Sequence, residues 1–142
     1  MLNAAYLGVR PLKKALSIDY RNLAPTIMDV PAAFGYLEEL LALADTGEYD
    51  EKEICEGLHE LIQVRLSDNL ASPDPVQAAR VFSWLVENQP HGDIEHFDIW
   101  LTVLVNVSAD TPVEEYLERK LAGSISAKER ELVHDALSEI RA

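Results

Sequence analysis

The sequence predicts an all-α protein, a single-domain bundle of about six or seven helices formed by residues 1–142, with one apolar helix at its centre. Two observations predict this fold class. Helix-start signals recur along the chain, and apolar residues follow them at the three- and four-residue spacing that lines one face of a helix. Apolar residues make up 48% of the 142 positions, which is typical of a chain that folds around a core.

The helices are expected, in chain order, at residues 11–18, 31–45, 50–68, 74–88, 93–107, 112–122 and 126–141, with residues 2–9 as a candidate for a further short helix. Four of them follow a residue that suits a helix cap, namely Asp50, Asp74, Thr111 and Ser126. Side-chain oxygens at these positions accept hydrogen bonds from the first amides of a helix, and proline fits the first helical position. Glycine and proline predict the ends, at Gly47, Pro90, Gly92 and Gly123.

Residues 99–107 are the ambiguous segment, because they are rich in β-branched side chains and could form a strand. The preceding start at Asp93 and the lack of a partner strand favour a helix over 93–107. That helix is apolar nearly all round, which predicts a central position in the bundle. The segment Ser72–Pro75 is the best candidate for a hinge.

The net charge of −13 is unevenly distributed. Residues 37–65 carry nine acidic side chains against Lys52 and Arg65, and residues 66–118 carry ten against Arg80 alone. Such an acidic belt attracts cationic partners and repels polyanions. Direct binding of nucleic acid is disfavoured, since the only small basic cluster is found at residues 10–14.

Cys55 is the single cysteine, so no internal disulfide can form. We therefore expect a reducing, cytoplasmic compartment. No signal peptide is expected, because the basic segment 10–14 follows the apolar first residues instead of preceding them. The longest stretch of low polarity, residues 99–107, is too short to span a membrane, so no membrane partner is expected.

Two Glu-x-x-His pairs, Glu56/His59 and Glu131/His134, have a spacing that can hold metal ions in helical bundles when the side chains project inward. At about 100° per residue, both glutamates point away from the apolar face of their helix. The segment 91–96 is rich in histidine and acids, but it fits a helix start whose dipole favours acids. No metal site and no cofactor are predicted.

Cys55 and His59 are neighbours on one flank of the expected helix 50–68. No motif of a cysteine enzyme surrounds them, and the nearby glutamates should raise the thiol pKa and disfavour the reactive thiolate. We expect Cys55 to be half-buried at the edge of the core, and the chain not to be an enzyme. The aromatic side chains at helical spacing are assigned to core packing, namely Tyr36, Phe82, Trp84, Phe97 and Trp100.

Glu53, Glu56 and Glu60 recur at three- and four-residue spacing and should line one exposed face of helix 50–68. Asp93, Glu95 and Asp98 would extend this surface if the two helix starts are adjacent. The alternative explanation of the acidic face is that it serves solubility alone.

Tyr49 lies between Glu48 and Asp50 in a polar turn with no apolar stripe to join. An exposed tyrosine among carboxylates has the composition of an interface hot spot. The alternative is a tyrosine folded over the start of the next helix.

These observations predict a small acidic cytoplasmic binding protein, of the inhibitor or immunity type, that covers a cationic site on a toxin- or nuclease-like protein. The predicted partner-binding residues are Glu48, Tyr49, Asp50, Glu53, Glu56, Glu60, Asp93 and Glu95. The alternative is a helical scaffold or oligomerisation domain whose apolar interface would include Trp84, Phe97 or Trp100 if these are exposed. A homodimer stays open.

Overall fold

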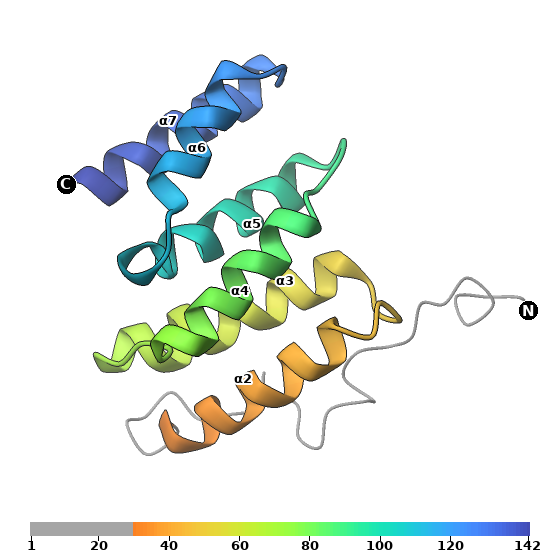
Figure 1. Cartoon of the computed structure of the whole chain (residues 1–142), viewed down its shortest axis with the longest axis vertical. Helices are drawn as coiled ribbons and strands as arrows, with labels where there is room; N and C mark the ends of the chain where they lie inside the picture. Colours follow the sequence, from red (N-terminus) through yellow and green to blue (C-terminus); the bar gives the residue numbers. More distant parts are fainter. Residues whose placement is uncertain (1–29) are drawn as a thin grey trace, which may run out of the picture. The chain divides into compact units, whose positions relative to one another are not determined.

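The computed structural model describes residues 30–142, which form six α-helices and no strand. The helices are α2 (Val30–Ala44), α3 (Glu51–His59), α4 (Pro75–Glu87), α5 (Ile94–Asn106), α6 (Val113–Ala122) and α7 (Ala127–Arg141) (Figure 1). The all-α prediction is therefore confirmed. The helices expected at 2–9 and 11–18, and the basic cluster at 10–14, lie outside the described residues.

The chain divides into two compact units, of which the first ends at Pro73 and the second spans Asp74–Ala142. The boundary falls inside the segment Ser72–Pro75 that the sequence indicates as a hinge candidate. Asp74 opens the second unit with a reciprocal cap on α4. Its side chain accepts from the amide of Gln77 at 2.8 Å, and the Gln77 side chain accepts from the amide of Asp74 at 3.3 Å.

In the first unit, α2 packs against α3 and against the residues that follow α3 (Figure 1). Its apolar residues recur every three or four positions, as an amphipathic helix requires. The buried ones are Ala33, Leu37, Leu40, Leu41 and Ala44, whereas Phe34, Tyr36 and Leu43 are half-buried and Ala42 is exposed. The buried residues of α2 pack in a core with buried residues from the second half of the unit, among them Ile54, Leu58, Leu61, Ile62 and Leu66.

The helix expected over 50–68 is confirmed in extent, but its second half is not α-helical. After α3 the backbone continues as a π-helix, η4 (Glu60–Leu66), and then as a short 3₁₀ turn, η5 (Ser67–Asn69). Arg65 is buried in η4, and its guanidinium pairs with the Glu60 carboxylate at 3.0 Å. Hydrogen bonds in a π-helix link residues that are five apart. Glu60 and Arg65 have the same separation, so one π-helical turn brings their side chains to the same side of the helix. Apolar spacing alone does not distinguish the two helix types here.

Leu70 ends this segment in the left-handed conformation, with φ 62° and ψ 32°, and is 98% exposed. An L-residue with a Cβ is strained there, whereas asparagine adopts this conformation more readily. We expect Leu70→Asn to raise the free energy of unfolding by about 0.5–1 kcal/mol. Chemical denaturation measures the change. Leu70→Ala, which shortens the exposed side chain but keeps the strain, is the control, and an equal gain in both variants would contradict the strain argument.

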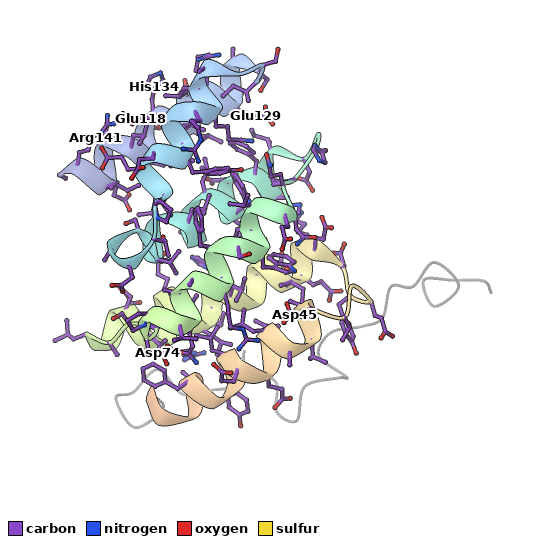
Figure 2. The ribbon with its side chains drawn as sticks, viewed as in Figure 1. Asp45, Asp74, Glu118, Glu129, His134 and Arg141 are labelled. Atoms are coloured by element: carbon purple, nitrogen blue, oxygen red, sulfur yellow. The ribbon has the colours of Figure 1, made fainter. Side chains whose placement is uncertain are left out.

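In the second unit, α5 packs against α4 and α7, and α6 packs against α7. From Trp100 to the end of α5 no side chain is exposed, so the ambiguous segment is the central apolar helix that the sequence predicts. The Trp100 indole N–H donates to the Leu85 carbonyl of α4 at 2.8 Å. Arg141 joins α7 to α6, because its guanidinium donates to Glu114 at 2.7 Å and to Glu118. Figure 2 labels Arg141 and Glu118.

Three of the four predicted caps are confirmed, at Asp50, Asp74 and Ser126. The Thr111 cap is wrong. The Thr111 hydroxyl donates to the Val107 carbonyl at 2.7 Å, and α6 begins after Pro112 with no side-chain cap. The short 3₁₀ turn η6 (Ser108–Asp110) brings that carbonyl within reach of Thr111, so the hydroxyl bonds backward along the chain.

Candidate functional site

The densest group of carboxylates in the first unit is the acidic segment, defined here as residues 45–60. It carries seven acidic side chains and one base, Lys52. The segment starts at Asp45, where α2 ends (Figure 2), turns through Gly47 at φ +72°, and continues along α3. The positive φ suits glycine because it has no Cβ. The chain thus places a turn and a helix with like-signed side chains next to each other.

The predicted interface residues in this segment are less exposed than the sequence suggests. Glu48, Tyr49, Glu53, Glu56 and Glu60 are all half-buried, and Asp50 is exposed.

Two of these carboxylates also stabilise the local fold. Asp50 accepts a hydrogen bond from the amide of Glu53 at 3.3 Å and so caps α3. Glu60 neutralises the buried Arg65. Glu53, Glu56 and Glu60, expected on one exposed face of the helix, are thus only partly exposed.

Cys55 is fully buried, so the expectation of a half-buried thiol at the core edge is wrong. The buried face of α3 is broad and also includes Ile54, Gly57 and Leu58. Burial raises the pKa of the Cys55 thiol, and the charges of Glu51, Glu56 and Asp50 raise it further. The thiol therefore stays protonated at neutral pH and is a poor nucleophile.

Asp93 and Glu95 are exposed at the start of α5, in the second unit. The Asp93 side chain accepts from the amides of Glu95 and His96, both at 3.1 Å. This cap agrees with the interpretation of residues 91–96 as a helix start. These two acids belong to a different unit from the acidic segment.

Within residues 30–142, no group of three or more His, Cys, Asp or Glu side chains could hold a metal ion. His134 is exposed on α7 (Figure 2), and Glu131 pairs with Lys128 at 3.1 Å. No helix in this part of the chain has the length and apolarity needed to cross a membrane.

A basic pocket that the sequence analysis missed lies in the second unit, with a volume of about 290 Å³. Its lining includes Gln89, Tyr116, Arg119, Lys120, Gly123 and Ile125. Lys120 donates to the Gln89 side chain at 2.7 Å, and its Nζ lies 5.2 Å from the centre of the Trp100 ring. A signal was present in the sequence, since residues 119–130 hold four basic side chains against Glu129 alone.

Trp84, Phe97 and Trp100, the aromatic residues that the scaffold alternative would need on the surface, are buried in the second unit. Phe97 and Trp100 stack with ring centres 5.5 Å apart. Tyr116 meets Trp100 edge-on at 6.1 Å. Of the five aromatic residues assigned to core packing, Trp84, Phe97 and Trp100 are buried, whereas Tyr36 and Phe82 are half-buried.

Comparison with protein-family models, with curated protein sequences and with solved structures gave no match. Within residues 30–142 the structure is helical, with the acidic segment in the first unit and the basic pocket in the second.

Proposed function

We propose that the protein is a small acidic binding protein of the inhibitor or immunity type, which covers a cationic site on a protein partner. A toxin or nuclease that acts on a polyanion needs such a cationic site, so a protein that blocks it is expected to be acidic. The observation that carries the proposal is the concentration of seven carboxylates against one base in the acidic segment.

The carboxylates of this segment act on one region of the first unit. Asp50, Glu51 and Glu56 all raise the pKa of the same buried thiol, Cys55. The negative electrostatic potentials of these three carboxylates therefore add at Cys55. A charge near the protein surface acts through a lower effective dielectric than one in bulk water, so half-buried glutamates such as Glu53 and Glu56 suit electrostatic capture of a basic surface.

Tyr49 provides the second element of the proposed interface. It is half-buried between Glu48 and Asp50. A tyrosine offers a large contact area with only two side-chain torsions to order when a partner covers it. In the proposal, the carboxylates speed association and Tyr49 slows dissociation.

The same proposal includes no catalytic role, no cofactor and no nucleic-acid partner. The protonated, buried state of Cys55 supports the absence of thiol chemistry. The single cysteine supports a cytoplasmic location, where disulfides are rare. The scaffold alternative loses support because Trp84, Phe97 and Trp100 are buried.

Affinity capture from the native cell tests the proposal. We expect the immobilised full-length chain to retain a protein of basic net charge. Raising the salt from about 0.05 to about 0.5 M should slow association with that protein at least about tenfold, because salt screens steering between opposite charges. Biosensor kinetics with the purified pair measure the rate, and added protein should inhibit the partner's activity. Retention of an acidic partner, or association that salt leaves unchanged, would contradict the proposal.

A further inference from the structure

The pocket in the second unit is basic although the whole chain carries a net charge of −13. Arg119 and Lys120 both line it, and they are adjacent at the end of α6. Arg130 lies close by, since its guanidinium donates to the Leu121 carbonyl at 2.8 Å. Two neighbouring cations in one hollow of an acidic protein repel each other, which an anionic ligand would relieve.

Two hydrogen-bonding groups at this pocket have capacity left for a ligand. The Tyr116 hydroxyl is buried and has no hydrogen-bond partner among the described residues, although buried hydroxyls normally have one. The second group is the Lys120 ammonium. It has three donors, and the Gln89 side chain accepts one hydrogen bond from it. Ser124 adds a hydroxyl to the lining.

The environment of Lys120 also favours an anion. Its Nζ lies over the rings of Trp100 and Phe97, 5.2 and 5.9 Å from their centres. Burial lowers the pKa of Lys120, while the charge of Glu129 opposes this effect. An anion bound beside the ammonium would offset its lost hydration.

We propose that this pocket binds a small organic carboxylate, with its anionic group held by Arg119 and Lys120 and its apolar body against Tyr116 and Ile125. The volume of about 290 Å³ leaves room for more than the carboxylate group. The pocket lies at the C-terminal end of α6, where the helix dipole opposes any anion and opposes multiply charged phosphate more strongly than a singly charged carboxylate. This binding is independent of the acidic segment.

Nuclear magnetic resonance titration of the full-length chain tests the proposal, with benzoate, acetate and inorganic phosphate as probes. We expect benzoate to shift the amide signals of Gly123 and Ser124 with a dissociation constant in the millimolar range. Acetate should bind several-fold more weakly because it lacks the apolar body. An absence of shifts at about 20 mM benzoate, or shifts by phosphate alone, would overturn the assignment.

Three variants locate the site. Lys120→Met removes the ammonium but keeps an apolar chain over Trp100, and should weaken benzoate binding at least about tenfold, as expected for loss of a charged hydrogen bond. Gly123→Val should weaken it similarly by filling the pocket. A Cβ at Gly123 meets the Lys120 carbonyl oxygen at an ordinary 3.5 Å, so the fold should tolerate the change. Lys128→Met, which removes an exposed charge outside the pocket, is the matched control. Binding equal to wild type in both pocket variants would overturn the proposal.

Discussion

We expect Trp100→Ala to lower the free energy of unfolding of the second unit by about 3–5 kcal/mol, the range found when buried aromatic side chains are truncated. Trp100 is 0% exposed. Its ring stacks on Phe97 and meets Tyr116, and its indole N–H satisfies the Leu85 carbonyl. The substitution opens a cavity among these rings and leaves a buried carbonyl without its donor, and the two costs add.

Denaturant titration followed by the fluorescence of Trp84 measures this loss, because Trp84 belongs to the same unit. Trp100→Phe keeps most of the ring volume and removes the indole donor, so it should cost about 1–3 kcal/mol and still fold. Val76→Ala is the control, since Val76 is 71% exposed and its truncation should change stability by less than about 0.5 kcal/mol. Equal stability of Trp100→Phe and the wild type would show that the indole hydrogen bond contributes nothing.

The second large effect concerns association with the captured basic partner. Replacing Glu48, Glu53 and Glu56 together with lysine should slow association about 10- to 1,000-fold at low salt, the range over which electrostatic steering acts. Asp50 is kept in this variant because it caps α3. Glu60 is also kept, because its reversal would place two positive charges together at the buried Arg65.

The matched control reverses Glu115, Asp135 and Glu139, which are exposed on α6 and α7 in the second unit. Both triple variants change the net charge equally, so only a local effect of the acidic segment separates them. Circular dichroism checks that each variant remains helical. If both variants associate at the same rate as the wild type at low salt, the acidic segment is not the interface. If both slow association equally, net charge rather than this segment steers the partner.

The helices of the described residues could be predicted closely because their signals are local. Asp74 and Ser126 bond to amides three residues away, and the apolar spacing of α2 and α5 repeats within each helix. The position of the acidic segment was also predictable, because it depends on residue type in one short stretch. The partial burial of Glu53 and Glu56 was not, since burial depends on how the chain packs rather than on residue type.

The Glu60–Arg65 pair and the basic pocket illustrate what local signals miss. The pair coincides with a π-helix, which has the same apolar spacing as the expected α-helix over these few residues. The pocket joins Gln89, after α4, to Arg119 and Lys120 of α6, and nothing in either stretch indicates the other.

The sequence by itself determined the helical class, most helix boundaries and the excess of carboxylates in residues 45–60, because capping, amphipathic spacing and charge depend on residues a few positions apart. Only the tertiary structure decided that Cys55 is fully buried, that Trp100 bonds to Leu85 and that Lys120 lies over aromatic rings beside a pocket. These features depend on packing between helices distant in the chain, which a one-dimensional pattern does not encode.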